Sequence, residues 1–245
     1  MTFTMPTHNE KAKYVQDQFN RIANGYDRCN DLVSLGMHRS WKHQAIKALN
    51  IKPTGNYLDV CCGTGDLTFI IAKSLTESGC VTGLDFSSKM LDIASSRSAD
   101  FFAKHKHVGS IAFINGDALN LPFADNTFDG AIISFGLRNL TDFNQGINEI
   151  SRVLKPQARL VNLDLGHPKP GLFTHVYNFY FNNIVPLIGE TFQNERTAYT
   201  YLPKSLEQYP DAQGISTILT NANLTNVEYR NLACGTVALH WGTVA

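Results

Sequence analysis

Three short groups of small and acidic residues each follow an apolar run in the first half of the chain. They are Gly63, Thr64 and Gly65, then Asp85, then Asp117 and Ala118. Glycines lack a Cβ and let a ligand approach the backbone closely, and a helix after the turn would present unpaired N–H groups. A carboxylate at Asp85 can accept hydrogen bonds from both hydroxyls of a ribose. A carboxylate or backbone group at Asp117 can accept one from an exocyclic amine, so these residues predict a nucleoside site.

The spacing of these groups argues against a dinucleotide. A dinucleotide turn carries a third glycine that lets helix and strand pack closely around a pyrophosphate, and Thr68 occupies that position here. Asp85 follows Gly65 by twenty residues, which suits NAD but equally suits adenosine attached to another group. No further group of this kind is left for a second nucleotide. A single nucleoside is therefore favoured, with an NAD-dependent oxidoreductase as the alternative.

The cysteines do not indicate a metal site. The chain has five, Cys29, Cys61, Cys62, Cys80 and Cys234. Their number is odd and their spacing is not that of a zinc site, and the adjacent Cys61 and Cys62 are poor disulfide partners. We expect reduced thiols in a cytoplasmic protein, with no metal.

Alternating strands and helices would have to position these groups. Buried strands are expected at 57–60, 80–85, 111–114, 128–134 and 160–165, with two closing strands at 227–230 and 235–241. Apolar residues at helical spacing fill most of the intervals. Alternation of this kind implies βαβ units. The expected fold class is α/β, a Rossmann-like, mostly parallel seven-stranded sheet with helices on both faces.

The segment before the first strand, residues 1–50, should form an N-terminal helical cap. Val15, Phe19 and Ile22 make a helical stripe, residues 26–31 look turn-rich, and a second helix is expected over 41–49. Open α/β sheets bind ligands at the carboxyl ends of their strands. We therefore expect the cap to lie there, over the main domain of residues 51–245.

An aromatic-rich insertion interrupts the main domain at about residues 171–205. Its most apolar part, 171–192, is crowded with phenylalanine and tyrosine. Such a segment either packs on the core or forms an apolar wall for a substrate.

Composition limits the partners. Lysine plus arginine number 21, as do aspartate plus glutamate, so no basic excess favours a nucleic acid. No apolar run of 18 residues exists to span a membrane. Peripheral membrane contact through 171–192 and association into a homodimer both stay open.

Several ordered motifs resemble those of class I S-adenosylmethionine-dependent methyltransferases. These motifs are Asp59–Gly65, Gly83–Asp85, Gly116–Ala118 and Arg152–Pro156. Other segments resemble one family within that class, the ubiquinone/menaquinone-biosynthesis C-methyltransferases. Those segments are Phe19–Ala23, Tyr26-Asp27, Asn30-Asp31, His38-Arg39, Trp41-Lys42, Leu121–Phe123, Phe135–Asn139, Tyr201-Leu202 and Ala238–Gly242.

The resemblance covers nearly the whole chain, with a few departures. Gln157-Ala158 stands where the family usually has Gly-Gly, and Asp164 where it usually has glutamate. A serine is usual near Gly166. Asp164 and Gly166 would line the acceptor side, so they bear on which substrate is accepted.

The resemblance implies a cofactor and a substrate. The cofactor is S-adenosyl-L-methionine, released as S-adenosyl-L-homocysteine, with Gly63, Thr64, Gly65, Asp85, Asp117, Ala118 and Ser134 as the cofactor-binding residues. The substrate is a prenylated quinol methylated on a ring carbon, with Tyr26, Asn139 and Tyr201 in contact with it.

Ring methylation requires an electron-rich carbon, and a phenolate supplies one. A phenol with a pKa near 10 is mostly protonated at neutral pH, so a base or a nearby cation is needed. Arg138 follows the expected strand 128–134 and is our candidate catalytic residue. Because a guanidinium stays charged, Arg138 would stabilise the phenolate or hold a water that takes the proton. The alternative is that Arg138 pairs with an acid and only holds its loop.

The ring of the quinol is less well specified. Cys61–Asp66 and Val237–His240 resemble the menaquinone branch more than the ubiquinone branch, which favours a demethylated naphthoquinol over a benzoquinol or demethylphylloquinol. Two other classes are an NAD-dependent oxidoreductase and a non-catalytic quinone carrier. Asp117-Ala118 argues against the first, and the intact turn with both acids argues against the second.

Overall fold

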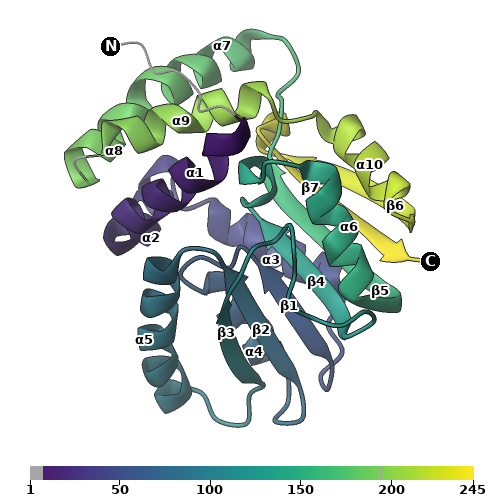
Figure 1. The fold of residues 1–245 in the computed structure, drawn as a ribbon. Helices are drawn as coiled ribbons and strands as arrows, with labels where there is room; N and C mark the ends of the chain where they lie inside the picture. The colour runs from purple at the N-terminus through teal and green to yellow at the C-terminus, as the bar shows by residue number, and fades with distance from the viewer. Residues whose placement is uncertain (1–7, 194) are drawn as a thin grey trace.

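A seven-stranded sheet forms the centre of the molecule (Figure 1), in the order β3-β2-β1-β4-β5-β7-β6. The computed structural model describes residues 8–193 and 195–245. The strands are β1 Asn56–Val60, β2 Cys80–Asp85, β3 Ser110–Asn115, β4 Phe128–Ser134, β5 Leu154–Leu165, β6 Leu224–Leu232 and β7 Val237–Val244. β1 to β5 are parallel, and β7 runs antiparallel to both β5 and β6. The predicted α/β fold is confirmed, including the two closing strands.

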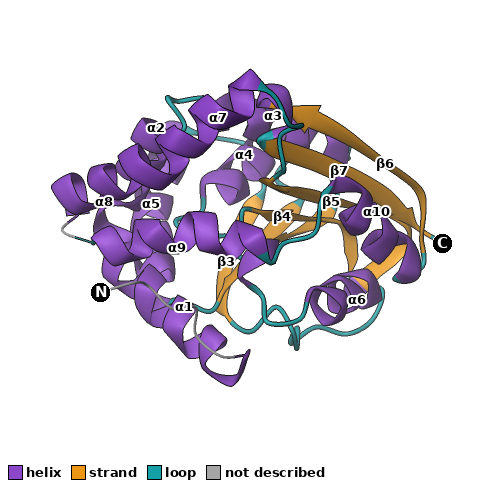
Figure 2. Cartoon of the chain, turned by 90° about the horizontal axis from the view of Figure 1, so that it is seen from above, coloured by secondary structure: helices purple, strands orange, loops and turns teal. Residues whose placement is uncertain are grey.

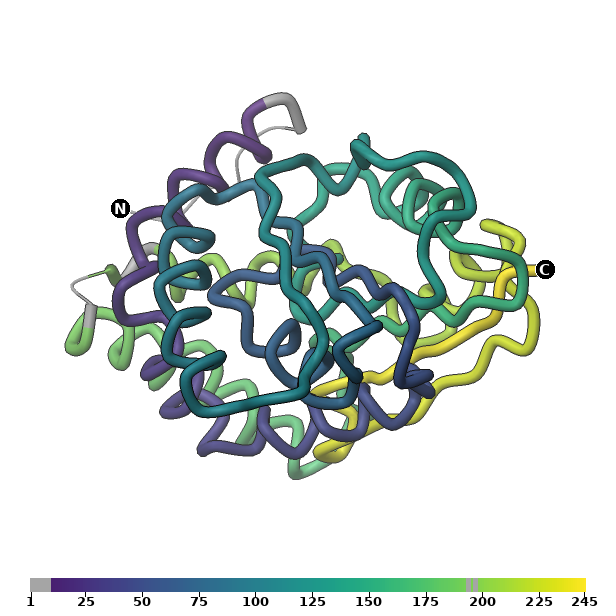
Figure 3. The backbone as a smooth tube through the Cα atoms, turned by 90° about the horizontal axis from the view of Figure 1, so that it is seen from below, coloured from purple at the N-terminus to yellow at the C-terminus, as the bar shows by residue number. Residues whose placement is uncertain are grey.

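Helices cover both faces of the sheet. They include α3 His38–Leu49, α4 Asp66–Ser74, α5 Ser88–Lys104, α6 Phe143–Val153 and α10 Ala212–Asn221. One buried core joins the sheet to α3 and α4, and another joins it to α6 and α10. Figure 3 shows β6 and β7 at the opposite side of the molecule from α5. The sheet is therefore enclosed on its faces and leaves the strand ends for ligands.

Side-chain caps fix where several of these helices begin. Ser87 accepts a hydrogen bond from the backbone N–H of Met90 at the start of α5. Asp142 does the same for Gln145 in α6, and Asp211 for Gly214 in α10. A side chain at this position satisfies an N–H that the helix itself cannot pair.

The N-terminal segment is more helical than expected. α1 spans His8–Ile22, a short 3-10 turn spans Ala23–Gly25, and α2 spans Tyr26–Val33. The prediction of a turn-rich segment over 26–31 is wrong, because Cys29 is fully buried and burial of a helix face outweighs weak local propensity. The predicted helix at 41–49 is α3, which begins three residues earlier and packs against β4 and β5.

The aromatic-rich insertion is a helical layer. It contains α7 Leu172–Phe179, a π-helical turn Tyr180–Ile184, α8 Val185–Gln193 and α9 Arg196–Glu207. Figures 1 and 2 show α7, α8 and α9 together with α1 and α2 at one end of the sheet. None of the helices in the described part of the chain is long and apolar enough to cross a bilayer.

Candidate active site

The parallel register brings the predicted groups to one edge of the sheet. Val60 of β1 lies opposite Leu84 of β2 and Ile133 of β4. The residues that follow these positions, among them Asp85 and Ser134, therefore end their strands side by side. The strand order places β1 between β2 and β4, and the crevice where strand order reverses is the usual ligand site of open α/β sheets.

The two glycines of the turn after β1 are needed for different structural reasons. Both have positive φ angles, +56° at Gly63 and +84° at Gly65. A Cβ at Gly63 would meet only the Tyr26 ring, 3.9 Å away, whereas one at Gly65 would lie 3.0 Å from Phe69 and 3.1 Å from Phe113. Gly63 therefore leaves room for a ligand. Gly65 allows α4 to pack closely and begins that helix.

Asp85 fastens the turn and faces the ligand side. One carboxylate oxygen accepts the backbone N–H of Gly63 at 2.8 Å, and the other accepts that of Ser87 at 2.8 Å. Burial raises the pKa of Asp85 to about 6, and the backbone hydrogen bonds oppose this rise. Asp85 therefore loses its charge at a higher pH than an ordinary aspartate.

A first cavity of about 90 Å³ lies over these strand ends. Its lining includes the predicted Gly63, Asp85, Asp117, Ala118 and Ser134. Ser134 Oγ is buried without a hydrogen-bond partner among the described residues. A strand-end carboxylate, an open space at Gly63 and an unpartnered hydroxyl suit a nucleoside cofactor.

Two of the predicted cofactor residues face elsewhere. Thr64 is buried and its hydroxyl donates to Asp27 of α2 at 2.7 Å. Gly65 packs against aromatic rings, as described above. Neither lines the first cavity, because the chain turns away from it after Gly63 to begin α4.

A second cavity is larger, about 540 Å³, and mostly apolar. Its walls come from the cap, the turn after β1, the end of β4 and the insertion. The insertion contributes Phe173, Val176, Tyr177, Tyr180 and Phe181. The two cavities share Tyr26, Cys61, Gly63, Ser134 and Phe135, so they adjoin.

Arg138 lies in the wall of the second cavity. Its guanidinium donates to Asp164 Oδ1 at 2.6 Å and to the Phe135 carbonyl at 2.6 Å. The ion pair is almost completely buried. Burial lowers the pKa of Arg138, but Asp164, together with Tyr26 and Tyr201, raises it, and the net shift is upward. Arg138 thus pairs with an acid, Asp164, as the alternative interpretation expected. Its side chain nevertheless borders the second cavity, so a catalytic role stays open.

The three predicted substrate residues have different positions. Tyr26 borders both cavities, and Asn139 borders the first. The side-chain amide oxygen of Asn139, Oδ1, is buried and has no hydrogen-bond partner among the described residues. Tyr201 borders neither cavity. It is 1% exposed, with its ring centre 5.7 Å from that of Tyr14, while the next residue along α9, Leu202, reaches the second cavity.

Aromatic residues of the insertion line the second cavity, and an apolar wall for a substrate was one of the two possibilities that the sequence offered for this segment. Phe173, Tyr177 and Phe181 stack in a row with ring centres 6.3 and 5.1 Å apart. Sequence reasoning named the segment but not this row, although the spacing of four residues was a usable signal. Phe135 adopts a left-handed backbone with φ +55°, for which its residue type gives no warning.

Residues 7–244 match the model of the ubiE/COQ5 methyltransferase family. The chain belongs to this family. It is therefore a methyltransferase with S-adenosyl-L-methionine as its cofactor.

Curated relatives in the ubiE/COQ5 family match over nearly their full lengths. One is a demethylmenaquinone methyltransferase of Desulfitobacterium hafniense, 42% identical over 94% of this chain and 89% of that protein. Another, of the same name, comes from Lactiplantibacillus plantarum and is 40% identical over 96% and 98%.

A solved structure resembles the fold of this ubiE/COQ5-family chain. It is a SAM-dependent methyltransferase, possibly a histamine N-methyltransferase, from Thermotoga maritima. It covers 94% of this chain and 99% of its own, with a TM-score of 0.63 and 18% identity. Identity this low supports the shared fold alone.

Proposed function

We propose that this protein transfers a methyl group from S-adenosyl-L-methionine to a ring carbon of demethylmenaquinol, giving menaquinol. The observation that supports this best is a cavity lined by Asp85, Asp117 and Ser134 that adjoins a mostly apolar one of about 540 Å³. A prenylated naphthoquinol is a large apolar molecule with a polar ring edge, and such ligands need mostly apolar pockets with few polar groups. The relatives named demethylmenaquinone methyltransferase support the same acceptor.

The cofactor would be held in the first cavity. Asp85 would bind the ribose, Asp117 and Ala118 the adenine, and Gly63 and Ser134 the remainder. When bound, the cofactor supplies an electrophilic methyl group on a sulfonium. The protein's contribution is alignment of donor and acceptor, which is worth roughly 7–11 kcal/mol in favourable cases.

The activation of the acceptor is assigned to Arg138. A cation in a buried wall lowers the pKa of a phenol beside it, because it stabilises the phenolate. Asp164 holds the guanidinium through one N–H and accepts the backbone N–H of Arg138 at 3.1 Å. The Arg138 Nε is buried without a partner among the described residues, and a quinol oxygen that reached the guanidinium would supply one. The hydroxyl proton would leave to solvent before the site closes, since Arg138 itself stays protonated. After methyl transfer, the hydrogen of the methylated ring carbon would be lost as a proton and the quinol oxygen would regain one, which restores the aromatic ring.

Tyr26 lies where the two cavities meet and would contact the ring. Burial raises the pKa of its hydroxyl, so Tyr26 stays neutral and acts as a hydrogen-bonding group rather than a base. The cap and the aromatic row of the insertion would exclude water from the junction, and charges act more strongly where water is absent.

The acceptor is tested by competition between rings. The protein is incubated with methyl-labelled S-adenosyl-L-methionine and equal amounts of reduced demethylated naphthoquinol and benzoquinol carrying the same short tail. We expect label in the naphthoquinol ring. Preferential labelling of the benzoquinol would contradict the proposed acceptor and would assign the enzyme to ubiquinone biosynthesis instead. Absence of labelling combined with tight NAD binding would favour an oxidoreductase instead.

A further inference from the structure

One face of the molecule exposes large apolar side chains. On α7, Leu172, Val176 and Phe179 are 83%, 63% and 64% exposed, and their spacing places them on one side of the helix. Leu35 and Met37, in the turn between α2 and α3, are 75% and 45% exposed. Contiguous exposed apolar surface of this kind marks an interaction site.

This apolar face is continuous with the second cavity. Leu35 and Met37 are both exposed and part of the cavity lining, and the same is true of Phe173 and Val176. These residues come from segments far apart in the sequence and border the same opening. An apolar molecule could therefore pass from this face into the cavity while staying in contact with apolar groups.

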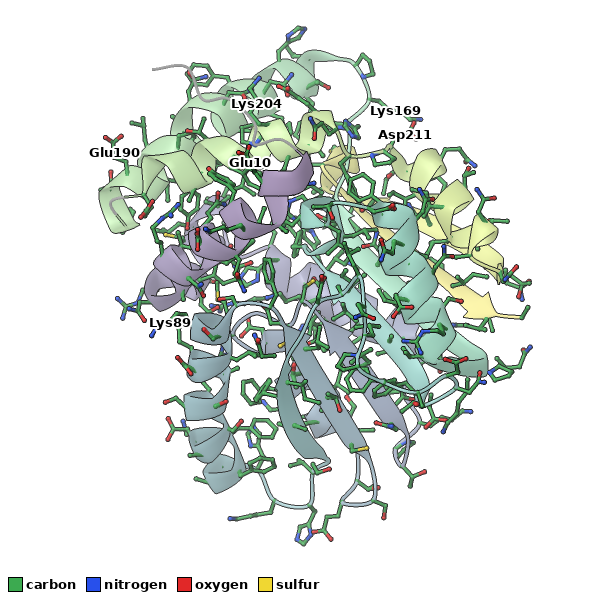
Figure 4. The ribbon with its side chains drawn as sticks, viewed as in Figure 1. Glu10, Lys89, Lys169, Glu190, Lys204 and Asp211 are labelled. Atoms are coloured by element: carbon green, nitrogen blue, oxygen red, sulfur yellow. The ribbon has the colours of Figure 1, made fainter. Side chains whose placement is uncertain are left out.

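The two segments that border the opening carry cations and no acids of their own. Residues 34–43 and 167–179 contain Arg39, Lys42 and Lys169 but neither aspartate nor glutamate. Arg39 and Lys42 pair with acids outside these segments. Lys169 is exposed just before α7 (Figure 4). Because Asp31 and Asp66 offset Arg39 and Lys42, the local excess comes from Lys169, a cation that suits an anionic surface.

We propose that α7 and the 34–37 turn form a docking face for an anionic lipid bilayer, through which the prenylated quinol enters the cavity. The inference rests on the proposed function, because a prenyl tail partitions into lipid. An amphipathic helix lies in the interface plane with its apolar side buried and cationic side chains at the headgroups. A second copy of this chain on the same face would close the opening. A bilayer would leave the opening in contact with the lipid in which the prenylated quinol is dissolved.

Vesicle binding tests the docking face. The full chain is sedimented with vesicles of phosphatidylcholine and phosphatidylglycerol, and the double variant Leu172→Glu/Phe179→Glu is compared with it. Neither residue lines a cavity. The matched control is Phe102→Glu, on α5 and 38% exposed. We expect the double variant to lose at least about tenfold in partitioning and the control to bind like the natural chain.

Activity in two substrate formats separates this inference from the proposed function. With a short-tailed quinol in solution, the double variant should turn over at the natural rate. With a long-tailed quinol in vesicles it should fall about tenfold. Equal sedimentation of the natural chain and the double variant would overturn the docking face. So would a dimer, seen by light scattering, that the double variant dissociates. Failure of the natural chain to methylate the short-tailed quinol would instead overturn the proposed function, leaving the vesicle result standing.

Discussion

Arg138 and Asp164 show how one ion pair can hold a cation at an apolar wall. The pair's side chains are 6% and 1% exposed, so neither charge is stabilised by water. Removing one partner of such a pair typically costs about 3–5 kcal/mol. Truncation of Arg138 would therefore both destabilise the fold and remove the proposed catalytic cation, and loss of activity could not be assigned to either effect.

Replacement of Arg138 by lysine keeps the charge and removes the planar fork. We expect turnover of the quinol to fall at least about 100-fold, as when a positioned donor to a developing oxyanion is lost. Binding of S-adenosyl-L-homocysteine, measured by calorimetry, should stay within about twofold. The matched control is Arg152→Lys, at a partly exposed arginine paired with Glu149 and Asp125. Near-natural turnover of Arg138→Lys would show that a positive charge at this position suffices and that the planar fork of Arg138 is not needed.

Asp85 should make cofactor binding depend on pH. Its pKa is raised to about 6 by burial. Below that pH the carboxyl is protonated and accepts fewer hydrogen bonds from the cofactor and from Gly63. We expect the Kd for S-adenosyl-L-homocysteine to rise as pH falls from 7 to 5.

The variant Asp85→Asn identifies the group that titrates. It should bind roughly 10–100-fold more weakly at pH 7, consistent with the loss of hydrogen bonds to a charged acceptor, and its affinity should change little with pH. Asp92→Asn, on the exposed side of α5, serves as the control. An unchanged pH profile in Asp85→Asn would assign the titration to another group.

At the scale of single residues, sequence predicts position better than orientation. Asp85 and Ser134 were found because each ends a parallel strand, and Asp117 because it closely follows one, and all such ends share one edge. Thr64 and Tyr201 face away from the cavities because of a backbone turn and a helix rotation, which depend on contacts made far away along the chain.

At the scale of elements, charged residues fasten the cap to the turn after β1. Arg97 of α5 donates to Asp27 of α2 at 3.1 Å, to the Thr64 carbonyl at 2.8 Å and to Asp66 at 2.7 Å. Lys42 of α3 also binds Asp66, at 2.9 Å. Burial tends to raise the pKa of Asp66, but the two cations lower it to about 2. Asp66 therefore stays charged at neutral pH, and the network ties three helices to the cofactor side.

Loss of Arg97 should loosen the cap without unfolding the sheet. In Arg97→Ala we expect faster hydrogen exchange in α2 and cofactor binding weaker by about 5–30-fold, equivalent to about 1–2 kcal/mol for several partly exposed charged contacts. Lys89→Ala, on the same helix with an exposed partner at 3.9 Å, should change neither. Exchange in α2 that matches the natural chain would mean that the cap is held by its apolar contacts alone.

The limits of sequence reasoning at this scale follow from tertiary contacts. The strands were predicted because buried parallel strands are continuous apolar runs. α2 was missed because its helix is stabilised by the burial of Cys29 against the rest of the protein and not by the helix propensity of its sequence. The π-helical turn at Tyr180–Ile184 has no local signature either, since such turns reflect packing around a site.

At the scale of the whole molecule, the sheet encloses an acidic residue. Asp59 on β1 is 1% exposed and accepts a hydrogen bond from Thr68 of α4 at 2.6 Å. Sequence assigned Thr68 to the place of a missing glycine, and the structure adds that its hydroxyl joins strand to helix. The placement of β7 between β5 and β6 was equally beyond reach, because strand order is set by pairing between distant segments.

Asp59 should make the protein's stability fall as pH rises. Burial raises its pKa to about 7, above the value of about 3.9 expected when unfolded. The folded state therefore binds more protons than the unfolded state between these values. The resulting stability is fully present below pH 4 and is lost as pH rises through 7. From pH 5.5 to pH 8 the contribution falls by about 2 kcal/mol.

Other buried groups also titrate, so the prediction concerns a difference between two proteins. Burial lowers the pKa of His38 and of His240. The stability that each histidine contributes to the protein is therefore lost as pH falls, whereas the contribution of Asp59 is lost as pH rises. Both histidines are present in Asp59→Asn, so their effect cancels. We expect urea unfolding to show the natural chain losing about 2 kcal/mol more than Asp59→Asn between pH 5.5 and 8. Parallel stability curves would mean that Asp59 is stabilised in its charged form, most directly by the Thr68 hydrogen bond and then by the Lys42 charge, both of which lower the Asp59 pKa.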